Sequence, residues 1–87
     1  MNFSASVIIP IYNEINFLET LCIKLKEVFK NSKIKYIFID DGSSDGSLEW
    51  LAKNLQTYFN TKEVELVSLK KNYGKGYAVR EGIKKVE

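Results

Sequence analysis

Two adjacent carboxylates, Asp40 and Asp41, are the residues of this 87-residue chain best placed to do chemistry. They follow the apolar run 34–39 and precede a turn of sequence Gly-Ser-Ser-Asp-Gly-Ser. Carboxylates at the carboxyl end of a buried parallel strand lie where open α/β sheets bind nucleotides. A carboxylate there can accept a hydrogen bond from a uracil or guanine ring N–H or from a ribose hydroxyl. Asp-Gly-Ser is also ordinary turn and helix-cap sequence, so a purely structural role stays open.

A second polar group follows the apolar run 5–11, which ends near Pro10 because proline has no backbone donor. Tyr12 offers a flat ring against a nucleobase, and such stacking contributes about 1–3 kcal/mol. Asn13 and Glu14 can contact the nucleotide or satisfy the first amides of the helix that follows, and both roles remain open.

A third group places Lys75 between Gly74 and Gly76 at the start of an expected helix. Glycines permit a close backbone approach, and a lysine there can meet the carbonyls of a base or a diphosphate. The spacing is not that of a P-loop. The neighbouring Lys70 and Lys71 are expected to be solvated charges at a strand end.

Apolar runs and helical stripes alternate along the chain and predict the elements that must position these groups. Strands are expected over 5–11, 34–39 and 63–69, with helices after each, the second starting at a cap at Ser44 or Asp45. This βαβαβα pattern predicts a three-layer α/β fold with a parallel sheet of about three strands in the order 3-2-1. Parallel strands end at one edge, so Tyr12, Asp41 and Lys75 should line a common crevice.

The helical stripes define the side chains that are expected to face the core. They comprise Phe17, Leu18, Leu21, Cys22, Leu25, Val28 and Phe29 in the first helix, Leu48, Leu51, Ala52, Leu55, Tyr58 and Phe59 in the second, and Ala78, Val79, Gly82, Ile83 and Val86 in the third. Trp50, Tyr58 and Phe59 follow helical spacing and are expected to be core residues rather than cofactor contacts.

Composition excludes several classes of function. The 13 basic and 11 acidic residues are intermixed and give a net charge of +2, which does not indicate a nucleic-acid partner. The chain has no histidine and a single cysteine, Cys22, which excludes zinc sites of the usual composition and an intrachain disulfide. No apolar run approaches the roughly 20 residues of a membrane span, and no signal peptide is evident, so the cytoplasm is the expected location.

Together the segments SVIIPIYNE at 6–14, IDDGSSDGS at 39–47 and NYGKGYAVREG at 72–82 resemble the family 2 nucleotide-sugar glycosyltransferases, in the right order and at about the right spacing. The resemblance covers the amino-terminal half of that family's GT-A type catalytic domain. It implies that residues 1–87 form a single truncated nucleotide-sugar-binding domain, an incomplete GT-A or Rossmann-like half. It also implies nucleotide contacts at Pro10, Tyr12, Glu14, Lys75 and Asp41, of which Asp41 contacts the base. Asp40 is expected either to orient the loop or to approach the ribose and metal region.

The resemblance further implies transfer of a sugar from a UDP- or GDP-sugar to an acceptor such as a polyprenyl phosphate or a glycan, in cell-envelope polysaccharide synthesis. In complete relatives Mg²⁺ or Mn²⁺ binds an Asp-x-Asp that follows a further strand, and that motif is absent from this sequence. We therefore expect the chain to hold no metal and to be inactive alone, with any membrane-surface acceptor met by other regions at the cytoplasmic face. The open edge at residues 7–11 is expected to self-associate.

Two other functions share part of this pattern. A non-catalytic folding or interaction module derived from the same family fits the same residues. A dinucleotide-binding Rossmann half shares the acid at the end of the second strand, but the turn after the first strand has no glycine-rich diphosphate cradle.

Overall fold

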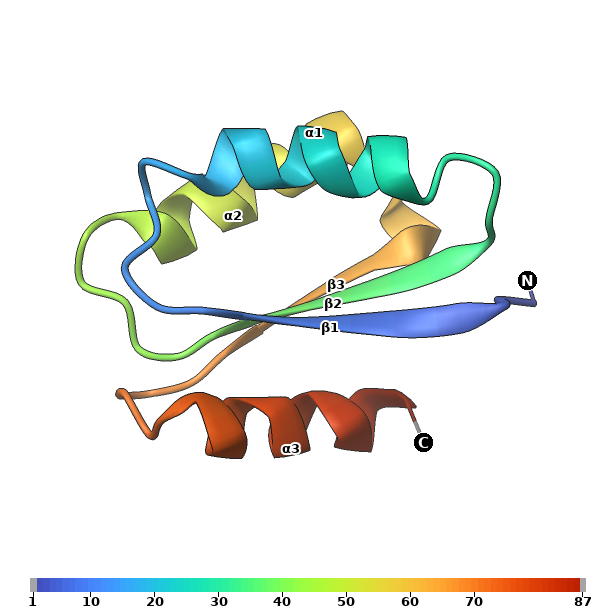
Figure 1. Ribbon diagram of the computed structural model, residues 1–87. Helices are drawn as coiled ribbons and strands as arrows, with labels where there is room; N and C mark the ends of the chain where they lie inside the picture. Colours follow the sequence, from blue (N-terminus) through green and yellow to red (C-terminus); the bar gives the residue numbers. More distant parts are fainter. Residues whose placement is uncertain (1, 87) are drawn as a thin grey trace.

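The computed structural model describes residues 2–86 and shows three strands and three α-helices in strict alternation (Figure 1). The elements are β1 (Ala5–Ile11), α1 (Leu18–Val28), β2 (Ile34–Asp40), α2 (Ser47–Tyr58), a 3₁₀ turn η1 (Thr61–Glu63), β3 (Val64–Ser68) and α3 (Lys75–Val86). All strand pairs are parallel and the order is β1-β2-β3. This confirms the predicted α/β class, strand order and βαβαβα topology; only η1 was not predicted.

The sheet lies between two layers of helices, with α1 and α2 on one face and α3 on the other (Figure 1). The larger core lies on the α1 and α2 side and includes Leu18, Phe38 and Leu51, all fully buried. On the α3 side, Ile37 and Ile39 pack with Ala78. Neighbouring residues of β2 point to opposite faces, so a strand covered on both faces needs apolar residues throughout.

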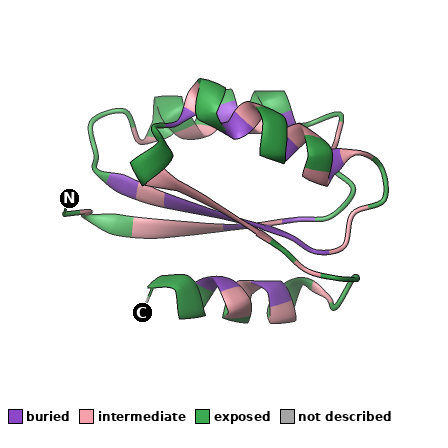
Figure 2. Ribbon diagram, turned by 180° about the vertical axis from the view of Figure 1, so that it is seen from behind, coloured by how far each residue is buried: buried purple, intermediate pink, exposed green. Residues whose placement is uncertain are grey.

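Several side chains that the helical stripes predicted to face the core are exposed. Val28 is 72% exposed at the end of α1, and Phe17, Ala52, Ile83 and Val86 are also exposed. Val28 and Val86 are the last residues of their helices, so no further turn covers them. α3 lies alone on its face of the sheet and buries only the narrow strip at Ala78 and Gly82. Figure 2 shows this strip facing the strands and half-buried or exposed residues on the rest of α3.

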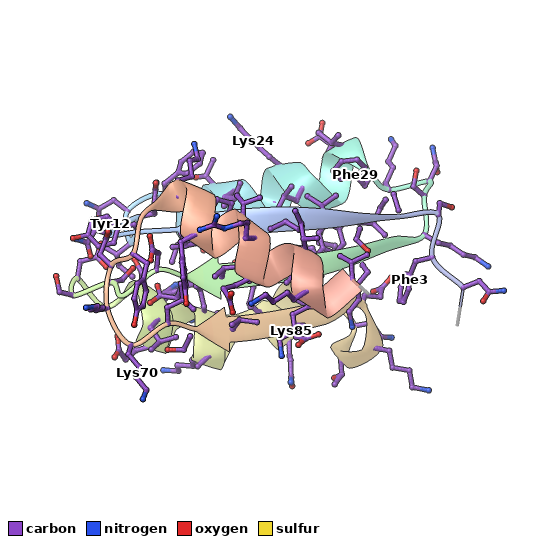
Figure 3. All side chains as sticks on the ribbon, turned by 90° about the horizontal axis from the view of Figure 1, so that it is seen from below. Phe3, Tyr12, Lys24, Phe29, Lys70 and Lys85 are labelled. Carbon is purple, nitrogen blue, oxygen red and sulfur yellow. The ribbon has the colours of Figure 1, made fainter. Side chains whose placement is uncertain are left out.

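The helices connect the ends of the strands so that one end of the sheet carries all three loops of interest. The chain leaves β1, β2 and β3 at that end and enters α1, α2 and α3, respectively (Figure 1). Figure 3 shows Tyr12 and Lys70 at this end and Phe3 at the other. No helix within residues 2–86 is long and apolar enough to cross a membrane.

Candidate functional site

A cavity of about 300 Å³ opens where the loops after the three strands meet. Its lining residues come from all three signature segments, which are residues 6–14, 39–47 and 72–82. They are Pro10, Ile11, Tyr12, Glu14, Asp41, Asn72, Gly74 and Lys75. Five of the six side chains singled out in the sequence therefore lie on one cavity, although they are up to 65 positions apart (Pro10 to Lys75). The parallel topology brings them together, because every strand delivers its last residue to the same edge.

Asp40 is the predicted site residue that does not line the cavity. It is 1% exposed, and its Oδ2 accepts a hydrogen bond from the Ser43 amide at 3.0 Å, which closes the turn after β2. Its Oδ1 is buried without a hydrogen-bond partner in the part of the chain that the structure describes. The bond from the Ser43 amide orients the loop, which is one of the two roles expected for Asp40, and its approach to a ribose stays a prediction.

Asp41 connects the second loop to the third. The residue is 3% exposed, and its carboxylate accepts hydrogen bonds from the amides of Tyr73, at 2.8 Å to Oδ1, and Gly74, at 3.0 Å to Oδ2. Its own amide donates to the Ile11 carbonyl at 2.8 Å and so extends the pairing of β2 with β1. An ionised carboxylate has about four acceptor positions, so about two are left after the bonds from the Tyr73 and Gly74 amides.

The loop after β1 is held by side chains of the loop after β2. The Asn13 amide donates to Ser43 Oγ at 2.9 Å, and the Asn13 side chain accepts from the Ser44 amide at 2.8 Å. The Glu14 amide donates to Ser47 Oγ at 2.9 Å. The Asn13 backbone is left-handed, with φ of 51°, a conformation that asparagine tolerates better than most residues. The capping role left open for Asn13 and Glu14 is not seen, because Phe17 precedes α1 without a side-chain cap.

Asp45 links the same two loops and holds the start of α2. Its Oδ1 accepts from the Ser47 amide at 2.9 Å and the Ser47 hydroxyl at 2.6 Å, and its Oδ2 accepts from the Ile15 amide at 3.1 Å. Gly46 occupies the position before α2, so Asp45 acts from one residue earlier than a usual N-cap. Desolvation raises the pKa of Asp45, but the hydrogen bonds from Ser47 and Ile15 outweigh it and leave the pKa below its ordinary value.

Lys75 is the first residue of α3 and its side chain borders the cavity. It follows Gly74, whose φ of 100° is a conformation that other residues rarely adopt. The Tyr73 ring of this loop stacks on the Tyr77 ring of α3, with centroids 4.4 Å apart. The Lys71 ammonium lies 5.3 Å from the Tyr73 ring centroid. The third loop is therefore fixed both to α3 and to Asp41.

Three cavity residues were not proposed as site residues from the sequence. Ile11 is the last residue of β1 and is almost fully buried. In the sequence it looks like any other apolar strand residue, so nothing there indicates that it lines the cavity. Asn72 and Gly74 flank Tyr73 in the third signature. The sequence indicates only backbone freedom for Gly74. The glycines on either side of Lys75 are the signal that could have placed Asn72 and Gly74 at the site.

The described residues do not fit a metal ion. Within residues 2–86 no group of three or more His, Cys, Asp or Glu side chains lies close enough to hold one. Asp41 already receives two amide hydrogen bonds, and Asp40 lies beneath the loop rather than on the cavity.

A sequence model of glycosyl transferase family 2 matches residues 6–87. The chain belongs to this family. This family 2 chain is 38% identical over 85 residues to an uncharacterized glycosyltransferase of Synechocystis, covering 95% of the chain and 26% of the relative. It is 33% identical over 82 residues to dolichyl-phosphate β-glucosyltransferase of Saccharomyces cerevisiae, covering 88% of the chain and 25% of the relative.

The fold of this family 2 chain is found in a larger solved structure. A mannosyltransferase of Pyrobaculum calidifontis, determined in complex with GDP-Man and Mn²⁺, superposes with a TM-score of 0.78 at 22% identity. The match covers 98% of this chain and 25% of the mannosyltransferase. The chain thus spans about a quarter of the length of the relatives it matches.

Proposed function

We propose that this chain binds the nucleotide of a UDP- or GDP-sugar in the cavity at the ends of the strands, as the donor-binding part of a glycosyltransferase. The observation that carries the proposal is the meeting of Tyr12, Asp41 and Lys75 on one cavity of about 300 Å³. Membership of glycosyl transferase family 2 supports sugar transfer, and the GDP-Man in the Pyrobaculum calidifontis structure supports a nucleotide-sugar ligand.

Each cavity side chain offers a different kind of contact to such a ligand. The two unused acceptor positions of Asp41 suit a ring N–H, which uracil and guanine have and which cytosine and adenine lack. Tyr12 is 46% exposed, so its ring is free to stack on a base beside Pro10. Lys75 supplies a positive charge for a base carbonyl or the diphosphate, and Glu14 can accept from a ribose hydroxyl.

The loop after β1 argues against a dinucleotide at this site. In dinucleotide-binding folds the corresponding loop presents free backbone amides to the pyrophosphate. Here the amides of Asn13, Glu14 and Ile15 already donate to the side chains of Ser43, Ser47 and Asp45. A diphosphate in this cavity would therefore rely on the Lys75 side of the site, as in our proposal.

We also propose that residues 1–87 form one nucleotide-binding domain that does not transfer sugar alone. The relatives it matches are about four times as long, so residues outside this chain can supply the acceptor site and the metal ligands. The names of two relatives, dolichyl-phosphate β-glucosyltransferases of Saccharomyces cerevisiae and Dictyostelium discoideum, support a lipid phosphate as the acceptor class.

The test is a calorimetric titration of the purified chain with UDP, GDP, CDP and ADP. We expect UDP or GDP to bind more tightly than CDP and ADP. Tyr12→Ala should weaken that binding by about 5-fold or more, since stacking contributes about 1–3 kcal/mol. Lys75→Ala should weaken it too.

Lys70→Ala is the matched control, because Lys70 is an exposed lysine of the same loop that does not line the cavity. Equal binding of all four nucleotides, or equal effects of Lys70→Ala and Lys75→Ala, would contradict the proposed site. No response to any nucleotide would favour a non-catalytic module instead.

A further inference from the structure

The loop between β3 and Lys75 is hydrogen-bonded to one side chain at the end of β2, that of Asp41. After Leu69, whose amide donates to the Asp40 carbonyl at 2.9 Å, the chain leaves the sheet. The next hydrogen bonds that the described residues show are those from the Tyr73 and Gly74 amides to the two carboxylate oxygens of Asp41. Hydrogen bonds from amides to an ionised carboxylate are shorter and stronger than those between neutral groups.

Gly42 makes the close approach of this loop possible. Its backbone is left-handed, with φ of 73°, and its α-carbon faces the backbone of Lys71 and Asn72. A Cβ atom at this position would overlap the carbonyl carbon of Lys71 and the amide nitrogen of Asn72. Both are main-chain atoms, so the loop as a whole would have to move away from the end of β2.

We propose that Asp41 and Gly42 are positioning residues for Lys75. Gly42 lets residues 71–72 lie against the end of β2, and Asp41 then holds the next two amides, at Tyr73 and Gly74. These two contacts set the backbone immediately before α3, and α3 begins with Lys75 at the cavity. Asp41 therefore serves the site twice, as an acceptor on the cavity wall and as the anchor of the loop that brings the lysine.

This inference rests on the proposed function in treating Lys75 as a nucleotide contact and Asp41 as an acceptor for the ligand. The attachment itself is tested without nucleotide, by amide hydrogen exchange of the ¹⁵N-labelled chain. In Asp41→Ala we expect the Tyr73 and Gly74 amides to exchange about tenfold faster or more, because each loses a charged acceptor. Gly42→Ala should do the same while leaving the carboxylate in place.

The stacked rings give a second measurement. Tyr73 and Tyr77 lie nearly parallel, with an interplanar angle of 21°, so the pair contributes to the near-ultraviolet circular dichroism of the chain, beside the Trp50–Tyr58 pair, as long as the loop is ordered. We expect this signal to fall in Asp41→Ala and Gly42→Ala. Asp41→Asn keeps one carbonyl oxygen as an acceptor, so it should protect one of the two amides, at Tyr73 or Gly74, from exchange. A general loss of stability would expose both amides equally and would not give this partial rescue.

Two matched controls separate the attachment from general loosening of the fold. Ser43 lies in the same loop as Asp41 but accepts from a different amide, that of Asn13. In Ser43→Ala the Asn13 amide should exchange faster, while the Tyr73 and Gly74 amides stay protected. Gly76→Ala adds a Cβ where no atom outside its neighbours lies within 4 Å, so it should leave the loop in place. Unchanged exchange at Tyr73 and Gly74 in Asp41→Asn and Gly42→Ala, or equal acceleration in Ser43→Ala, would overturn the proposal.

Nucleotide titration then distinguishes this inference from the proposed function. If UDP or GDP binds, Gly42→Ala should weaken it although Gly42 does not line the cavity. Faster exchange at Tyr73 and Gly74 with no nucleotide binding in the parent chain would support the attachment and reject the proposed function. Nucleotide binding that Gly42→Ala leaves unchanged would keep the proposed function and reject the positioning role.

Discussion

Most polar side chains of the 40–47 loop are acceptors for neighbouring backbone rather than free groups. Four of them accept a hydrogen bond from a backbone amide of the loop after β1 or the loop after β3, namely Asp41, Ser43, Asp45 and Ser47. Asp40 accepts one from an amide of its own loop. Buried or half-buried amides need such partners, and short Asp and Ser side chains reach them without filling the cavity. The residue types that suggest nucleotide chemistry thus also explain why three loops hold one geometry.

Cys22 is a residue whose burial determines its chemistry. It is a fully buried residue of α1, and desolvation raises the pKa of its thiol from 9.0 to about 11. The thiolate is the reactive form, so the folded chain should not react with iodoacetamide at pH 8 while the urea-unfolded chain should. Mass spectrometry of the alkylated protein measures this, and rapid labelling of the folded chain would contradict the burial.

The same pKa shift predicts how stability depends on pH. Above pH 9 the unfolded chain loses the Cys22 proton while the folded chain retains it until about pH 11, so the free energy of unfolding should fall across this range. Below pH 9 both states hold the proton and the contribution is constant. Cys22→Ala, which has no proton to lose, should show a smaller decrease in urea unfolding experiments from pH 8 to 11. An equal decrease in the variant would contradict the assignment.

At the scale of elements, the packing of α3 against the sheet depends on Gly82. A Cβ atom at Gly82 would lie 2.5 Å from Cγ2 of Ile8 in β1 and 3.5 Å from Cδ1 of Ile39 in β2. Gly82→Ala should therefore lower the free energy of unfolding by about 1–3 kcal/mol, since overpacking forces strands and helix apart. Urea unfolding measures the change.

Gly76→Ala is the matched control for this substitution, because it lies in the same helix with open space around it. It should be neutral or stabilising by up to about 1 kcal/mol, as expected for glycine to alanine in a helix. Equal loss of stability in the two variants would show that α3 does not pack as closely on Ile8 as described.

The sequence predicted the elements well because their patterns are local. β1 begins and ends as predicted, at Ala5 and Ile11, and the start of α3 was predicted to within one residue. Side-chain orientation was predicted less well at Ile83, because the helical period does not reveal how wide a surface the sheet offers. The partners of Asp41 could not be predicted, since the amides that donate to its carboxylate lie 32 and 33 positions along the chain and depend on the folded loop.

For the whole molecule, the consequential feature is that β1 is an edge strand. Among residues 2–86 its only strand partner is β2, and the residues along it are Ala-Ser-Val-Ile-Ile-Pro-Ile. An apolar edge with free N–H and C=O groups is a template for pairing with a second chain. We therefore expect the 87-residue chain to self-associate through β1, with a sedimentation coefficient that rises with concentration.

A charged residue on the edge should prevent this pairing. Ala5 is exposed at the start of β1, so Ala5→Lys should shift the chain toward monomer, because edge lysines resist strand addition. Ala52→Lys adds the same charge on an exposed position of α2, away from the edge, and should leave the association unchanged. Sedimentation velocity at several concentrations compares the three proteins. The expectation would be contradicted if the parent chain stayed monomeric at all concentrations and melted sharply and reversibly. Equal effects of Ala5→Lys and Ala52→Lys would assign the association to another surface.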